Sequence, residues 1–217
     1  MELREYINES LTQLSGVKYN HSFTDRNGTY HENGYQPRNS KAFRKLFFEL
    51  TKERGWNSDL NDIDVSKVTD LSGLSMGLSM FNCDISGWDT SKVEHMDNAF
   101  YNAKSFNYDL SKWNTSRVKT MKGMFNNASS FNQDISNWDV SNVEDMRDMF
   151  CNAVSFNQPI GVWKVDNSRV IEVHNMFYNA KSFDQDLSNW NLRRAIGSEY
   201  MFDGCPIRDE YKPILAS

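Results

Sequence analysis

The stretch from Phe131 to Phe150, FNQDISNWDVSNVEDMRDMF, decides the fold because most of the chain repeats it. Its opening phenylalanine, its tryptophan and its closing phenylalanine recur at steps of 25 residues, with one longer step of 27. The opening positions are Phe81, Phe106, Phe131, Phe156 and Phe183, and the tryptophans are Trp88, Trp113, Trp138, Trp163 and Trp190. A fixed period of this length is typical of proteins that stack successive copies of one structural unit.

The period divides the chain into three expected parts. Residues 1–55 precede the repeats, residues 56–205 contain them, and residues 206–217 form a short tail. The expected coils are 56–80, 81–105, 106–130, 131–155, 156–182 and 183–205. The first coil is degenerate, as expected for a copy beside a cap. The coil at 156–182 carries two extra residues between Trp163 and Val170, which predicts a bulged loop.

Residues 1–55 are expected to form a helix, a hairpin and a second helix that together cover the first coil. Apolar residues at helical spacing predict a helix over 2–14, and they are Leu3, Tyr6, Ile7, Leu11 and Leu14. The dipeptide Asn27-Gly28 predicts a tight turn within a hairpin over 17–36. A second apolar stripe predicts a helix over 40–54, with Ser40 as its N-cap and Gly55 at its end.

Each coil is expected to comprise an extended arm, a turn and a short helical or 3₁₀ segment, which is the size of a leucine-rich-type repeat. One coil has nothing of its own to bury its tryptophan and phenylalanines against, so stacking is obligatory. Repeated asparagines are expected to hydrogen-bond the backbone of neighbouring coils. The repeated aspartates Asp84, Asp109, Asp134 and Asp186 are expected to cap helices or turns, since the glycine-rich nonapeptides of calcium-binding repeats are missing.

Composition limits the function classes. The chain has 217 residues, a net charge of −5 and a pI near 5.4, which argues against a general nucleic-acid binder. Cys83, Cys151 and Cys205 occupy three different positions of the repeat, so they are expected to be free thiols. The first residues form no signal peptide, and no run approaches the ~18 apolar residues of a membrane span. We therefore expect a cytoplasmic protein without membrane contact; a surface location remains open if a signal has been removed.

Motifs for catalysis are missing from the sequence. It contains no phosphate-binding loop, dinucleotide fingerprint, zinc-protease motif or nucleophile elbow. His21, Asp25, His31 and Glu32 cluster around the expected hairpin, but two histidines ten residues apart are weak evidence for a metal. His95 and His174 are expected on the surface. The sequence thus predicts a protein that is not an enzyme and has no metal and no cofactor.

The phrases FNQDISNWDVSNV and MFNNASSFN resemble the BspA-like surface-protein repeats, a mycoplasma-type family of unknown function with 25-residue repeats. The resemblance covers about 56–205, and LNDIDVSKVTDLSGL resembles the family's first coil. It implies an α/β fold, namely a leucine-rich-repeat-like right-handed solenoid with an N-terminal helical cap. It also implies adhesion or protein binding without catalysis. Members occur as bacterial surface lipoproteins and in protists, large viruses and phages.

Binding surfaces in repeat proteins come from positions that vary while the repeated frame stays fixed. The candidate protein-binding residues are Glu94, Tyr101, Lys119, Lys122, Glu144, Arg147, Glu172 and Tyr178. The same variable positions include Asn98, Gly123, Asp148 and Asn175. The sequence favours a non-enzymatic module that binds another protein. Three alternatives remain: a phage- or mobile-element-type inhibitor that occludes one partner, a solvated face whose residues drift without function, and, least favoured, an enzyme built on residues 1–55.

Overall fold

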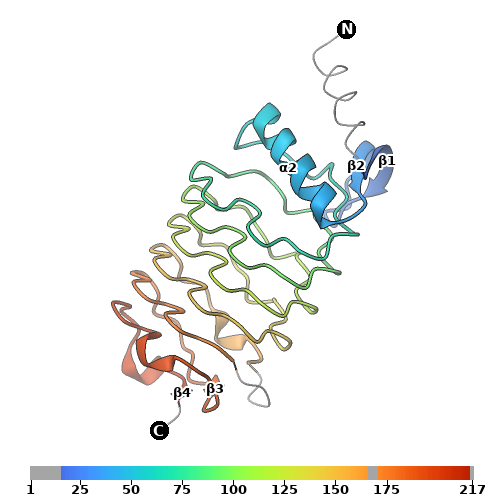
Figure 1. Ribbon diagram of the computed structural model, residues 1–217. Helices are drawn as coiled ribbons and strands as arrows, with labels where there is room; N and C mark the ends of the chain where they lie inside the picture. The colour runs from blue at the N-terminus through green and yellow to red at the C-terminus, as the bar shows by residue number, and fades with distance from the viewer. Residues whose placement is uncertain (1–15, 166–170, 216–217) are drawn as a thin grey trace.

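The computed structural model describes residues 16–165 and 171–215 (Figure 1). The predicted helix over 2–14 and most of the predicted bulge between Trp163 and Val170 lie outside these ranges. The described elements are β1 (Val17–Thr24), β2 (Tyr30–Pro37), α2 (Ser40–Arg54), η1 (Ile160–Val162), β3 (Asn191–Leu192), η2 (Ser198–Tyr200), η3 (Asp209–Tyr211) and β4 (Ile214–Leu215). β1 pairs antiparallel with β2, and β3 pairs parallel with β4.

The repeats lie one upon another in a stack that begins beside α2 (Figure 1). Isolated parallel bridges join neighbouring copies at one position of the repeat. The bridged column is Asp70, His95, Thr120, Asp145, Glu172 and Ile196. Further backbone hydrogen bonds tie each copy to the next, such as Phe100 N–H to the Met124 carbonyl at 2.8 Å and Phe125 N–H to the Met149 carbonyl at 2.9 Å.

The predicted α/β class, a leucine-rich-repeat-like right-handed solenoid with a helical cap, is wrong. In the described ranges α2 is the one α-helix, and the sheets have two strands each. The described repeats therefore contribute short 3₁₀ turns at η1 and η2 but no α-helix, and their strands form no continuous parallel sheet. The physical reason lies in the repeated Asp-x-Ser sequence. Asp84 and Asp134 each accept a hydrogen bond from the backbone N–H two residues on, at 3.0 and 2.9 Å, and such turns interrupt any regular run. The aspartates therefore cap turns, as predicted.

Two columns of residues have left-handed backbone conformation, and they explain the glycines and asparagines of the repeat. The first column is Gly73, Asn98, Gly123, Asp148 and Asn175; the second is Gly77, Asn102, Asn127, Asn152, Asn179 and Gly204. Their φ angles lie between 53° and 79°. Glycine, asparagine and aspartate tolerate this region, whereas other side chains clash with the backbone there. The repeated frame is thus set by backbone conformation as much as by the apolar core.

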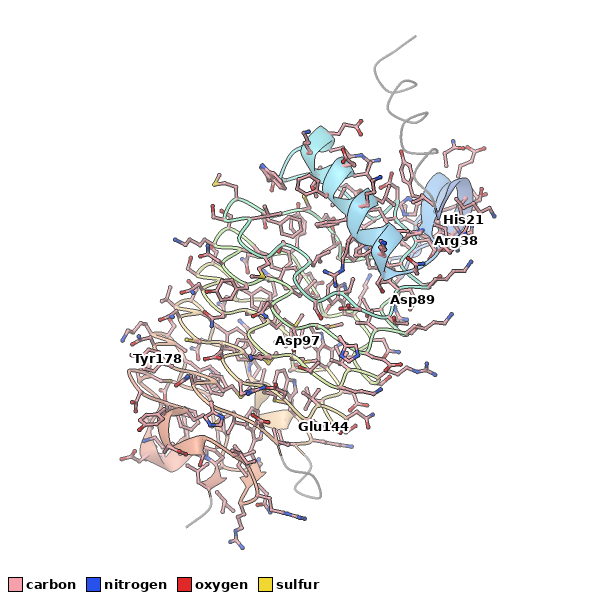
Figure 2. All side chains as sticks on the ribbon, viewed as in Figure 1. His21, Arg38, Asp89, Asp97, Glu144 and Tyr178 are labelled. Atoms are coloured by element: carbon pink, nitrogen blue, oxygen red, sulfur yellow. The ribbon has the colours of Figure 1, made fainter. Side chains whose placement is uncertain are left out.

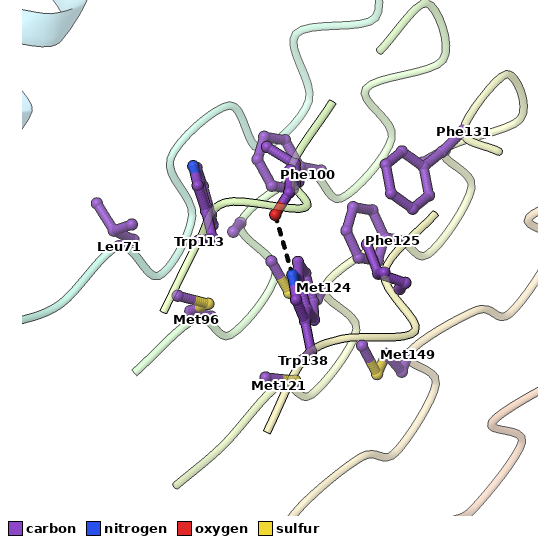
Figure 3. Close-up of a cluster of buried hydrophobic side chains, with 14 of the residues drawn as sticks. Leu71, Met96, Phe100, Trp113, Met121, Met124, Phe125, Phe131, Trp138 and Met149 are labelled. Atoms are coloured by element: carbon purple, nitrogen blue, oxygen red, sulfur yellow. Dashed lines mark hydrogen bonds between the residues drawn. The ribbon is translucent and has the colours of Figure 1, made fainter. Parts of the chain in front are cut away.

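Aromatic rings fill the interior of the stack (Figure 3). Phe125 stacks on Phe131 of the next copy with ring centroids 3.9 Å apart, and Phe131 lies 6.0 Å from Phe156. Trp88 and Trp113 stack at 6.3 Å with nearly parallel rings. Because these contacts join different copies, each ring is buried only when its neighbours are present. The predicted packing of these side chains between copies is confirmed.

A tryptophan hydrogen bond and an asparagine ladder supplement this packing. The Trp138 indole N–H donates to the Leu110 carbonyl at 3.0 Å, and Trp88, Trp113 and Trp163 make the equivalent bond. Side-chain oxygens of Asn82, Asn107, Asn132 and Asn157 accept the backbone N–H of the next copy at 2.9–3.0 Å. The predicted role is therefore confirmed for this column, whereas the column of Asn102, Asn127, Asn152 and Asn179 bonds the next copy through its backbone N–H groups instead.

α2 packs on the first copies through its predicted apolar stripe. Phe43 meets Trp88 edge to face at 5.4 Å between centroids, and Phe47 lies 5.7 Å from Phe81. The N-cap is Asn39, whose side chain accepts from the Ala42 N–H, rather than the predicted Ser40. The Ser40 hydroxyl instead accepts the Asp70 N–H at 3.2 Å, so it satisfies a backbone group at the edge of the stack.

The predicted hairpin is present, and its turn docks on the stack at Gly87. Arg26 N–H donates to the Gly87 carbonyl at 2.9 Å, and Asp25 packs so closely that a Cβ on Gly87 would lie 2.6 Å from its Oδ2. The next two copies have Lys112 and Asn137 at this position. Glycine at this one copy therefore marks the place where the hairpin meets the repeats.

Asp25 holds the docked turn together. Burial acts to raise its pKa, but hydrogen bonds from His31 and from the N–H groups of Thr29 and Asn27 outweigh burial and hold the pKa below its ordinary value. The ionised carboxylate therefore stabilises the fold at pH values above the unfolded pKa of about 3.9. That contribution is lost as the pH falls through the lower folded-state pKa.

We expect Trp138→Phe to lower the free energy of unfolding by about 1 kcal/mol more than Trp190→Phe. Both changes remove similar volume, but of these two tryptophans only Trp138 loses an indole hydrogen bond, since the buried Trp190 Nε1 has no partner in the described ranges. Chemical denaturation of the two variants measures the difference. Equal losses would contradict the assigned role of the indole hydrogen bond.

We expect Asp25→Asn to destabilise the protein at pH 7 and to weaken the loss of stability on acidification below about pH 4. The reason is that the amide cannot titrate and cannot replace the charged partner of His31. Denaturation midpoints between neutral and acidic pH provide the measurement. The control is Asp109→Asn, which changes an exposed carboxyl in an ordinary repeat turn; identical acid profiles for the two variants would refute the prediction.

Candidate interaction surface

The candidate residues Glu94, Lys119 and Glu144 lie in register on three successive copies, directly before the bridged column. Lys119 N–H donates to the Glu94 carbonyl and Glu144 N–H to the Lys119 carbonyl, each at 2.8 Å. We define the charged strip as these three residues together with the neighbouring Arg117, Lys122, Asp145, Arg147 and Glu172. The backbone bonds fix the spacing of its side chains from copy to copy.

The sign of the charge alternates along the charged strip from Glu94 to Lys119 to Glu144. The Lys119 ammonium lies 2.5 Å from the Glu94 carboxylate, and this hydrogen-bonded pairing lowers the pKa of Glu94. Around them lies an open depression of about 350 Å³. Its lining residues are Glu94, Ser116, Arg117, Lys119, Asn142 and Glu144. A mixed-charge concavity of this kind accommodates a polar protein surface better than an apolar ligand.

Arg147 joins coil 131–155 to coil 156–182 within the charged strip. Its guanidinium lies 2.6 Å from Asp145 and 3.1 Å from Glu172 of the next copy. The hydrogen bonds to Asp145 raise the pKa of Arg147, with a smaller contribution from the charge of Glu172. Lys122 is half-buried, and its backbone N–H donates to Asp97 at 3.2 Å. The structure thus places Lys122, Arg147 and Glu172 close to the same bridged column.

Tyr101 and Tyr178 belong to a separate region. They occupy one column with Asn126 and Cys151, seven positions after Glu94 in the first of these copies. Figure 2 shows Tyr178 at one edge of the stack and Glu144 nearer the opposite edge. Tyr178 is 39% exposed, whereas Cys151 is buried, and burial together with Asp148 raises the pKa of its thiol to about 11. The eight candidate residues therefore form two groups.

Several variable positions have structural roles that the sequence did not reveal. Asn98, Gly123, Asp148 and Asn175 form the first left-handed column. His174, expected on the surface, packs against Gly197 and has a buried Nδ1 without a hydrogen-bond partner in the described ranges. Variation at these positions reflects the few residue types that fit a strained backbone. The sequence does carry a signal for this column, because only glycine, asparagine and aspartate occur at its positions.

The histidines and acids of the hairpin do not converge on one point. His21 pairs with Asp64 at 2.8 Å and His31 with Asp25 at 3.0 Å, and both rings stack on the intervening Phe23. In residues 16–165 and 171–215, no three side chains from His, Cys, Asp and Glu are grouped to hold a metal ion. Asp64, which sequence reasoning missed, connects the hairpin to the first coil. The three cysteines are free thiols, as predicted.

No helix in the described part of the chain combines the length and hydropathy needed to cross a bilayer.

We expect Arg147→Ala to change the free energy of unfolding by less than about 1 kcal/mol, because its ion pairs are partly exposed. Gly123→Ala is expected to cost about 1–2 kcal/mol, since alanine is strained at φ 60° and its Cβ would meet the Asn98 side chain. Urea denaturation of both variants tests this ranking. A reversed order would mean that the charged strip stabilises the stack.

Comparison with known proteins identifies one family. The model of the family described as "Mycoplasma protein of unknown function, DUF285" matches residues 41–150 and 112–211. No curated protein and no solved structure matches the chain. The matched ranges include α2 from its second residue and all the complete repeats, and they cover more than half of the sequence. The chain therefore belongs to this mycoplasma-type repeat family of unknown function.

Proposed function

We propose that this protein is a non-enzymatic module that binds another protein through the charged strip. The observation that carries the proposal is the register of Glu94, Lys119 and Glu144. Backbone hydrogen bonds of 2.8 Å hold these outward-facing residues in fixed sequence along the stack. A surface that is ordered before binding loses little conformational entropy on association.

The alternation of charge specifies the chemistry of the partner. A protein that binds here presents acidic groups to Arg117 and Lys119 and basic groups to Glu144 and Glu172. Such complementarity contributes mainly to specificity and to the rate of association. Exposed pairs such as Lys119–Glu94 can exchange their internal partner for one on another protein at small cost, because water already screens them.

The resemblance of the repeats to BspA-like surface proteins is a more specific assignment than the matched family. It favours an adhesion-like role for this binding. The tyrosine group, the half-buried Tyr101 and the exposed Tyr178, is a second contact region, since tyrosines are frequent in binding hot spots. No observation favours the inhibitor of the phage or mobile-element type, which stays a prediction from the sequence.

The test is capture of partners from the native host by the purified protein, followed by binding measurements with the identified partner. We expect Lys119→Glu combined with Arg147→Glu to weaken binding at least tenfold, which corresponds to about 1.4 kcal/mol. The matched control is Lys104→Glu with Lys164→Glu, which makes the same charge change at exposed lysines outside the charged strip.

Because the charged strip and the tyrosine group are separate, variants in each can show which of the two binds the partner. Binding that survives in the charged-strip variant and is lost in Tyr101→Ser with Tyr178→Ser would move the site to the tyrosine group and contradict the proposal. Equal weakening by the charged-strip variant and its lysine control would indicate a nonspecific effect of net charge. Denaturation midpoints of all variants verify that the stack is intact.

A further inference from the structure

An apolar groove lies between α2 and the turn of the first coil. It has a volume of about 180 Å³. The groove is lined by Phe43, Arg44, Phe47, Phe48, Leu71, Gly73, Leu74 and Leu78. Phe48 is 54% exposed, and Met76, which is 58% exposed, adjoins Gly73. Large apolar side chains gathered at an exposed groove mark a binding site.

The outer face of α2 beside this groove is basic, although the whole chain has a net charge of −5. Its exposed residues are Lys41, Arg44, Lys45, Phe48, Glu49, Lys52 and Glu53. Arg44 also borders the groove, where it binds Asp70 and the Ser72 carbonyl. An occupant that matches this surface combines an apolar face with negative charge.

We propose that residues 2–14 of the same chain bind in this groove. Their sequence predicts a helix with one apolar face, formed by Leu3, Tyr6, Ile7, Leu11 and Leu14. Glu2, Glu5 and Glu9 supply the negative charge that the basic face of α2 complements. No other stretch of the chain is predicted as an amphipathic helix apart from α2 itself.

The position of Gly16 places this segment within reach. The Gly16 carbonyl accepts the Arg38 N–H at 2.7 Å, and Gly16 lies against Ala42 in the first turn of α2. A helix over 2–14 would be about 20 Å long, whereas α2 with its side chains is about 10–12 Å wide. A segment that starts at Gly16 can therefore cross the basic outer face and reach Phe48 and Met76 on the far side.

The test is hydroxyl-radical footprinting of Phe48 and Met76 in the full-length chain. We expect Ile7→Asp with Leu11→Asp to raise labelling of both side chains about two- to threefold, because labelling follows the exposed area of a side chain. The matched control, Asn8→Asp with Thr12→Asp, adds the same charge on the opposite face of the predicted helix and is expected to label like the native protein. Circular dichroism and tryptophan fluorescence verify that all three proteins are folded.

Three results would overturn the proposal. Equal labelling of the native protein and the Ile7→Asp, Leu11→Asp variant means that the groove is open and available to a partner protein. Equal increases in the two variants mean that charge, not the apolar face, is responsible. Native protection that disappears on dilution, together with a dimer in size-exclusion chromatography, assigns the groove to a second copy of the chain.

Discussion

Burial of aromatic rings between neighbouring copies is the interaction on which this structure depends. A single copy presents its phenylalanines and tryptophan at its two faces and has no interior of its own. Phe131 lies between Phe106 and Phe156, with its ring centroid 6.0 Å from each of theirs. The burial of each ring therefore requires the copies on both sides. Stability in such an array is a sum of interfaces between neighbours, and damage at one copy weakens the interfaces on both sides of it.

The second constraint is the backbone of the turn-rich copies, whose polar groups no regular sheet or helix satisfies. The structure solves this with bonds between copies: isolated bridges, asparagine side chains and indole N–H groups each reach the adjacent copy. Left-handed residues direct their N–H groups to the next copy, as when Asn127 donates to the Cys151 carbonyl at 2.8 Å. Because these bonds fix the register of the copies, they also fix the spacing of the residues on the charged strip.

The sequence predicted the features that depend on composition and period. The 25-residue step, the buried rings, the hairpin at Asn27-Gly28 and the helix over 40–54 were all visible in it. The secondary structure of the copies could not be predicted, because short turns closed by Asp84 or Asp134 show neither the hydrophobic period of a helix nor that of a strand. The choice of Asn39 over Ser40 as N-cap depends on a contact with Asp70, which is far away in sequence. Tyr178 and Glu144 were predicted to belong to one binding surface because both occupy variable positions of the repeat. Variability between repeats does not indicate on which side of the stack a side chain lies.

Gly87 makes the copies unequal. Coil 81–105 bears the docking site of the hairpin, and coil 106–130 reaches the same turn through Lys112 and Asn27 at 2.8 Å. Among the described residues, the hydrogen bonds that leave coil 131–155 reach only the coils before and after it. Duplication or deletion of that middle unit would therefore preserve both hairpin contacts, whereas loss of either unit under the hairpin would remove one of them.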